Sequence, residues 1–179
     1  MNFKRFFLII ALSISAVFSI FAQEIENIGT TSSHSIGVRG GTGWGNSFVA
    51  GLSYQYHFND KLSYITYLDY ENGKFNKSRF HSINIKPAVE YTVWRPKDWF
   101  ALNLGGGLIL AYDIWNNYYG GDKGIAIGAE LGLNLEFYAI PELSFTLGAQ
   151  QGWKYSFLQN GDYNYFCPLF SAGIKYNIR

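Results

Sequence analysis

Apolar and polar residues alternate with a period of two over much of this chain. In the segment 124–138, GIAIGAELGLNLEFY, the odd positions from Ile125 to Phe137 are apolar, and the even positions are mostly small, polar or charged. Because successive side chains of a strand point to opposite faces, such a run predicts a strand with one apolar face. The segments that share this pattern are the predicted strands: 33–41, 47–58, 62–71, 81–93, 100–112, 124–138, 143–155 and 166–178.

The connections between the predicted strands alternate between short and long. The short connections, 59–61, 95–98 and 140–142, are rich in Pro, Asn or Asp, which favour tight turns. The longer connections are 42–46, 72–78, 113–123 and 156–165. This alternation predicts one all-β domain over 33–179, an eight-stranded antiparallel up-and-down barrel.

Two barrel architectures fit these strands, and they differ in which face is turned inward. A soluble lipocalin-like barrel buries its apolar face, whereas an outer-membrane barrel turns that face to lipid. The non-apolar face combines glycines such as Gly105 and Gly132 with long charged side chains. Such a mixture can fill the narrow interior that eight strands enclose, whereas the many bulky apolar side chains would overfill it. We therefore expect a transmembrane barrel of the outer-membrane type.

Charged residues on the non-apolar face form the first candidate site. Those expected to point into the lumen are Arg39, Lys86, Glu90, Glu130, Glu136, Lys154 and Lys175. We expect them to neutralise one another as a network of interior ion pairs, and the alternative is a proton or ion path. An open pore is not expected, because eight strands leave room only for side chains.

The first residues, MNFKRFFLIIALSISAVFSIFAQ, have the organisation of a signal peptide. Two basic residues, Lys4 and Arg5, precede an apolar run that ends at Phe21. We therefore assign 1–22 to a signal peptide and 23–32 to an N-terminal segment before the barrel. Export and a barrel fold together predict the outer membrane of a Gram-negative bacterium, with both ends of the barrel chain in the periplasm.

Composition agrees with such a barrel and bears on its partners. Aromatic residues make up 19% of the chain and charged residues 15%, well below the usual quarter. The 14 Lys and Arg residues nearly balance the 13 Asp and Glu residues, so no nucleic-acid-binding face is expected. The expected partners are outer-membrane lipid, lipopolysaccharide and the barrel-assembly machinery.

Catalytic chemistry has little support in the pattern. A barrel enzyme acting on lipid would need a Ser nucleophile beside a His base. The three histidines, His34, His57 and His81, form no His-x-Ser pair on one predicted face, and with the single Cys167 they show no metal-ligand spacing. We expect no catalytic residue, metal or cofactor, and a lipid-modifying barrel enzyme remains the alternative.

Aromatic residues in two of the longer connections form a second candidate site. They are expected to be exposed in extracellular loops and are Trp115, Tyr118, Tyr119, Tyr163 and Tyr165. Aromatic residues are favoured in binding surfaces, and the alternative is an aromatic girdle that dips into lipopolysaccharide. In the last strand, Gly173, Tyr176 and Ile178 resemble the C-terminal signal that the bacterial barrel-assembly machinery reads.

Several segments between Asn46 and Arg179 together resemble the TraO family of conjugative transposon proteins of Bacteroides-type bacteria. They are FVAGLSYQYHFNDKLSY, PAVEYTVWRPKDWFALNLGGGLILAYD, GAELGLNLEFYAIPELSFTLGAQQGW and FSAGIKYNI. The resemblance implies a non-enzymatic, structural barrel of a conjugative DNA-transfer apparatus, with other conjugative-transfer proteins as partners. A small outer-membrane barrel with loop-mediated adhesion or surface protection is the alternative.

Overall fold

The computed structural model describes residues 34–43, 47–75, 78–97, 99–117, 120–159 and 161–178. The expected signal peptide at 1–22 and the segment 23–32 lie outside these ranges. Within the ranges, no helix is both long enough and apolar enough to cross a membrane.

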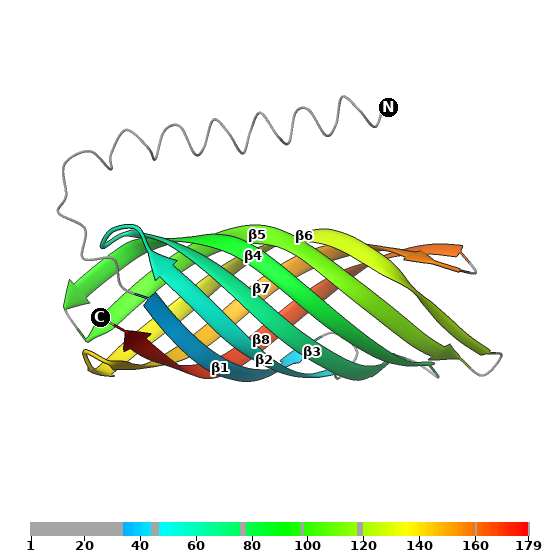
Figure 1. The fold of residues 1–179 in the computed structure, drawn as a ribbon, viewed down its shortest axis with the longest axis horizontal. Coiled ribbons are helices and arrows are strands. Elements are labelled where there is room, and N and C mark those ends of the chain that lie inside the picture. The colour runs from blue at the N-terminus through cyan, green and yellow to red at the C-terminus, as the bar shows by residue number, and fades with distance from the viewer. Residues whose placement is uncertain are drawn as a thin grey trace, which may run out of the picture. The chain divides into compact units, whose positions relative to one another are not determined.

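Eight antiparallel strands close into one barrel (Figure 1). Each strand pairs with its neighbours in sequence, and the last strand pairs with the first. The strands are β1 (His34–Gly43), β2 (Ser47–His57), β3 (Leu62–Phe75), β4 (Ser78–Lys97), β5 (Phe100–Asn117), β6 (Gly120–Ile140), β7 (Leu143–Leu158) and β8 (Gly161–Ile178). The structure confirms the predicted eight-stranded up-and-down barrel.

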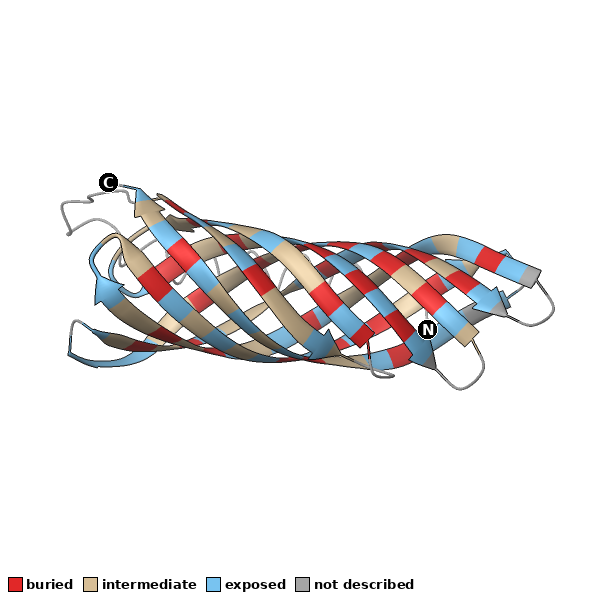
Figure 2. Ribbon diagram, turned by 90° about the horizontal axis from the view of Figure 1, so that it is seen from below, coloured by how far each residue is buried: buried red, intermediate tan, exposed pale blue. Residues whose placement is uncertain are grey.

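Buried and exposed residues alternate along the strands (Figure 2). Most large apolar side chains point outward, and Leu131 on β6 and Leu52 on β2 are 72% and 57% exposed. Between the two ends of the barrel, the charged side chains point inward, and Glu136 on β6 is only 2% exposed. This is the reverse of a water-soluble barrel, because burying charge and exposing apolar surface are both unfavourable in water.

The two ends of the barrel differ in how far the strands reach. We call the end where β1 begins and β8 ends the near end, and the opposite end the far end. At the far end, the β1–β8 ladder stops at Gly43 and Leu169, while β7 and β8 stay paired out to Leu158 and Gly161. The hairpins β5–β6 and β7–β8 therefore extend beyond β1, as Figure 1 shows.

The prediction of a loop is wrong for three of the longer connections. The described residues of the segments 72–78, 113–123 and 156–165 are almost entirely strand. Most of their outward residues are polar, with Ile114 and Phe157 as exceptions, and their inward residues include large aromatics. The alternation therefore weakens or inverts beyond the apolar outer wall. A strand prediction that requires apolar residues on the outward face therefore ends these strands too early.

The near-end connections are short, as predicted, but the connection between β4 and β5 lies later in the sequence than predicted. The side chain of Asn59 closes the β2–β3 turn by accepting hydrogen bonds from the backbone N–H groups of Lys61 at 2.9 Å and Leu62 at 2.7 Å. The predicted turn at 95–98 is instead mostly strand, because β4 continues to Lys97. A shift of the β4–β5 register between Thr92 and Lys97 accommodates the extra length.

Candidate functional site

The inward side chains form charged clusters along the barrel, and the first lies near the near end. Lys175 Nζ is 3.6 Å from the Glu136 carboxylate and donates a hydrogen bond of 2.6 Å to Gln55. Glu136 also accepts a hydrogen bond of 2.6 Å from the hydroxyl of Ser144. All four side chains are buried, so this cluster pairs its charges away from solvent.

A larger cluster crosses the middle of the barrel. The guanidinium of Arg39 on β1 binds the Asp69 carboxylate on β3 through two nitrogens, with Nε 2.9 Å from Oδ1. Lys86 Nζ on β4 is 3.5 Å from Asp69 and 3.0 Å from Glu130 on β6. The Arg39 guanidinium also stacks 3.5 Å from the ring centroid of Tyr67. These contacts link four strands through the interior.

Glu90 on β4 is held mainly by neutral donors. Its carboxylate accepts hydrogen bonds from the Tyr67 hydroxyl at 3.2 Å, from the Asn134 amide, and from the Gln55 amide at 3.4 Å. Asn134 also donates to the Tyr67 hydroxyl at 3.3 Å. Glu90 therefore lies between the near-end and middle clusters and connects their residues.

The cluster toward the far end is centred on Lys154 of β7, which is 1% exposed. Its Nζ lies 3.7 Å from Asp113 and 3.9 Å from Glu71 and donates a hydrogen bond of 3.0 Å to Asn84. Asp113 also accepts a hydrogen bond of 2.9 Å from the Tyr165 hydroxyl. A buried lysine is thus neutralised by acidic groups from two other strands.

The aromatic residues expected in exposed loops lie elsewhere. Trp115 is on β5 and Tyr165 on β8, both are buried inside the barrel, and both pack with Phe80 of β4. The rings of Phe80 and Trp115 stack with centroids 5.1 Å apart. Tyr163 is on β8, 41% exposed, with its ring 5.8 Å from that of Trp115. The exposed-loop expectation is wrong for the two buried residues, because inward positions this far along the barrel need bulk to fill the lumen.

The other two predicted loop aromatics, Tyr118 and Tyr119, lie outside the described residues. The expectation of an extracellular aromatic loop therefore concerns only Tyr163 among the residues whose side chains are described. Its ring packs against the rings of Trp115 and Tyr165, which with Phe80 form the inner aromatic cluster at the far end.

Inward glycines make room for these long side chains. A Cβ atom added to Gly51 on β2 would lie 2.1 Å from the Asp69 carboxylate oxygen and 2.8 Å from the backbone oxygen of Leu68. One added to Gly148 on β7 would lie 2.4 Å from the side-chain oxygen of Asn134. Asp69 and Asn134 fit in these positions because the register partner of each on the neighbouring strand has no side chain.

The structure places every predicted lumen charge in the barrel interior and brings all of them into the polar clusters. The residues are Arg39, Lys86, Glu90, Glu130, Glu136, Lys154 and Lys175. Sequence reasoning did not include their acidic partners Asp69, Glu71 and Asp113. Asp69 and Glu71 already lay on the predicted polar face of their strand, and Asp113 continues the inward positions Ala101 and Ala111 of β5. The two-residue alternation of inward and outward positions along each strand could have identified them.

The gaps beside two of the described clusters are small. Two gaps between inward side chains, one beside Glu90 and one beside Arg39, have volumes of about 10 Å³ each. Such a gap holds one water molecule at most. The clusters therefore fill the cross-section at these levels, and the geometry suits a packed plug better than a solute channel.

The nearest approach to a nucleophile and base lies at the near end. Ser35 Oγ is 3.3 Å from His57 Nε2, a pairing across β1 and β2 that the sequence pattern did not indicate. The same hydroxyl donates a hydrogen bond of 2.6 Å to Asn177, and Ser35 is 1% exposed. A substrate carbonyl cannot reach a serine buried in this way. Within the described strands, no group of three His, Cys, Asp or Glu residues is placed to hold a metal ion.

The residues of the predicted assembly signal lie at the C-terminal end of β8. Tyr176 and Ile178 point outward and are 52% and 42% exposed. Gly173 faces the interior, where an added Cβ atom would lie 2.7 Å from the backbone oxygen of Val38. Their role in assembly stays a prediction.

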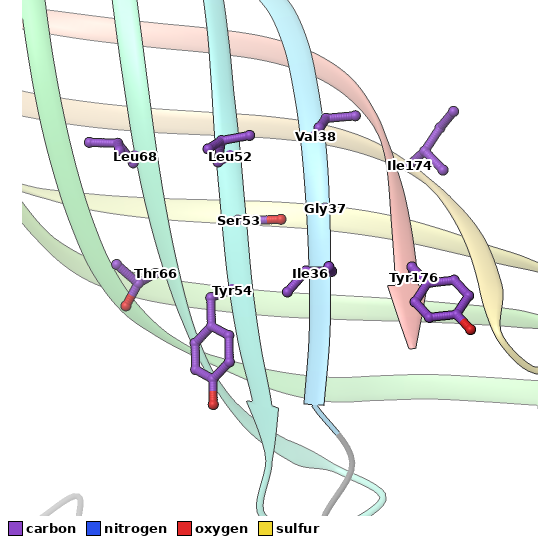
Figure 3. A pocket seen from close by; sticks show the side chains of 10 residues that line it. All are labelled: Ile36, Gly37, Val38, Leu52, Ser53, Tyr54, Thr66, Leu68, Ile174 and Tyr176. Atoms are coloured by element: carbon purple, nitrogen blue, oxygen red, sulfur yellow. The ribbon is translucent and has the colours of Figure 1, made fainter. Parts of the chain in front are cut away.

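A shallow hollow of about 660 Å³ lies on the outer wall over β8, β1, β2 and β3. Figure 3 shows the side chains around it, with Ile36 and Val38 on β1, Leu52 on β2 and Ile174 on β8. It is open and almost entirely apolar. Its dimensions and lining fit hydrocarbon chains lying against the wall.

Comparison with known proteins supports the fold. No protein-family model matches the sequence, and neither does any curated protein. The structure is similar to the N-terminal β-barrel domain of Pseudomonas aeruginosa OprF, with a TM-score of 0.61 and 16% identity over 82% of this chain and 97% of that chain. Neisserial surface protein A (NspA) gives a TM-score of 0.60 and 15% identity over the same shares, 82% and 97%.

Ail, the attachment invasion locus protein of Yersinia pestis, is also similar, with a TM-score of 0.51 and 17% identity over 82% of this chain and 97% of that one. At these identities the likeness shows the fold, an eight-stranded barrel of the outer-membrane type. The resemblance to the TraO family gains no support from these comparisons.

Proposed function

We propose that this protein is an integral outer-membrane barrel that works as a non-enzymatic surface or scaffold protein and not as a pore. One observation carries the proposal: an apolar outer wall surrounds an interior filled by interlocked ion pairs. A wall of this kind is stable only against hydrocarbon, and the paired charges occupy the space through which water and solutes would have to pass. Function then lies on the outer surfaces, with the near end in the periplasm and the far end outside the cell.

Insertion is tested by fractionation and by gel mobility. A folded outer-membrane barrel should partition with outer-membrane markers and migrate differently before and after boiling. Recovery of the protein in the soluble periplasm or the medium would contradict the proposal.

Conduction is tested separately in planar bilayers. The filled lumen predicts no steady current from the purified, inserted protein, whereas a porin in the same bilayer supplies the positive control. A stable open-channel current would show that the interior clusters rearrange, and would favour the ion-path alternative.

Attachment or surface protection is supported by the far-end extension of β5 to β8. The similar structure of Ail is named for attachment and invasion, so a barrel of this fold can carry an adhesive surface. Binding of cells that express this protein to host or bacterial surfaces, compared with a deletion strain, tests this form of the proposal.

A structural role in conjugative transfer rests on the sequence segments that resemble the TraO family. It predicts that deletion lowers transfer frequency of a resident conjugative element and that conjugative-transfer proteins co-purify with the barrel. Unchanged transfer and a locus without transfer genes would contradict it.

A further inference from the structure

Basic side chains gather on the outer wall at the far end, just beyond the apolar surface. Lys74 on β3, Arg79 on β4 and Lys123 on β6 are all exposed. Lys74 and Arg79 are direct cross-strand partners. We call Lys74, Arg79 and Lys123 the basic patch.

The pairing of Lys74 with Arg79 is unfavourable without a counter-charge. Directly opposed side chains on one face of an antiparallel pair have Cβ atoms about 5 Å apart, and like charges there repel. The acidic residues of the same hairpins give no relief, because Glu71, Asp113 and Asp122 are on the inward face and are buried. Among the described outward residues of this far-end part of β3 to β6, every charged one is basic.

Neutral polar groups complete the surface between the basic residues. Asn116 on β5 is exposed and is the cross-strand partner of Arg79. His81 follows Arg79 on the outward face of β4, and its Nδ1 shares a hydrogen bond of 2.8 Å with the Tyr70 hydroxyl. An anion at this surface would therefore find amide, imidazole and phenol groups beside the three cations.

The patch borders apolar surface directly. Tyr70 on β3, Ile83 on β4 and Tyr112 on β5 are register partners across the three strands and are 43%, 53% and 41% exposed. They lie on the side of the patch that faces the middle of the barrel. A ligand that fits both surfaces has an anionic head above hydrocarbon chains.

We propose that the basic patch binds the phosphate group of a lipid in the membrane leaflet at the far end, with the acyl chains of that lipid against the outer wall of β3 to β5. This inference rests on the proposed membrane insertion of the barrel. Arg79 and the lysines supply charge-assisted hydrogen bonds to phosphate oxygens, and Arg can do so through two nitrogens. A phosphorylated saccharolipid of the outer leaflet has the required chemistry.

The test uses the mature full-length protein in phosphatidylcholine nanodiscs that contain a small fraction of bis-phosphorylated lipid A, or the same lipid after removal of its phosphates. The lipid that stays bound after transfer to detergent is measured by mass spectrometry. We expect about tenfold greater retention of the phosphorylated form. Retention should fall to the level of the dephosphorylated lipid in the combined variant Lys74→Gln, Arg79→Gln, Lys123→Gln.

A matched control removes the same number of charges at the other end. The exposed near-end residues Lys61, Arg95 and Lys97 are changed to Gln together, and this variant should retain phosphorylated lipid like the wild type. Equal retention of the two lipids by the wild type, or loss of retention in the control variant, would overturn the inference. Displacement of the lipid by inorganic phosphate or heparin at matched anion concentration would also overturn it, because the site would then select soluble anions.

Failure of membrane insertion is distinguishable from failure of lipid recognition. Before each measurement, the heat-dependent gel shift reports whether the barrel has inserted. A wild-type protein that does not insert would overturn the proposed function and this inference with it. Normal insertion with equal retention by the wild type and the patch variant would overturn the lipid site alone.

Discussion

Arg39 on β1 and Asp69 on β3 form a two-point ion pair across the barrel interior, although β2 lies between their strands. The pair is possible because Gly51 on the intervening strand has no side chain and sits directly beneath the Asp69 carboxylate. Lys86 then reaches Asp69 from the other side and joins it to Glu130. The contacts of this pair thus join residues of four strands in the middle of the barrel interior.

Removing the acidic partner should destabilise the barrel. Asp69→Ala leaves the buried Arg39 guanidinium without its carboxylate, and loss of one partner of a buried pair typically costs about 3–5 kcal/mol. Urea titration in lipid vesicles, followed by tryptophan fluorescence, measures the change in unfolding free energy. The double variant Arg39→Met, Asp69→Leu should lose less than Asp69→Ala, because no charge is left unpaired. A loss in the double variant as large as that in Asp69→Ala would contradict this account.

Adding one methyl group beneath the pair should also be unfavourable. In Gly51→Ala the new Cβ atom would meet Asp69 at 2.1 Å, so the carboxylate must move away from Arg39. Overpacking of this kind costs about 1–3 kcal/mol. The matched control is Gly40→Ala on β1, where the nearest atom to an added Cβ lies 3.8 Å away. Equal effects of the two substitutions on unfolding free energy would argue against a packed interior.

A charge on the outer wall should report the membrane. Leu133 on β6 is outward, 40% exposed, and pairs with Leu104 and Ala149 in the middle of the apolar wall. Leu133→Arg should cost about 2–4 kcal/mol of unfolding free energy in vesicles if this position faces the bilayer midplane. Asn164→Arg, exposed and outward at the far end of β8, should cost less than about 1 kcal/mol. A negligible effect at Leu133 would contradict the lipid-facing assignment.

Tryptophan quenching distinguishes the inner aromatic cluster from the outer wall. Trp153 on β7 is outward and 45% exposed, whereas Trp115 is 7% exposed inside the barrel. In single-tryptophan variants with the other tryptophans changed to Phe, brominated lipid should quench Trp153 strongly and Trp115 weakly. Strong quenching of Trp115 by lipid would place it on the outside, as an upper girdle would require.

Local alternation was sufficient to predict the barrel and its faces. The run from Ile125 to Phe137 shows why, because strand parity alone assigns each side chain to one face, and the glycines on the other face disfavour a solvent surface. The same argument correctly assigned Glu130 and Glu136 to the interior. It failed beyond the apolar wall, where outward positions such as Lys74 become polar and the inward Trp115 becomes aromatic.

By itself, the sequence determined which residues share a face, since that depends only on the two-residue period of a strand. The tertiary structure decided which of them touch. Lys175 meets Gln55, and Lys154 meets Asn84, because strand tilt and register bring distant segments to one level of the lumen. The far-end extension was also decided there, because backbone pairing continues wherever a neighbouring strand is available, whatever the polarity of its side chains.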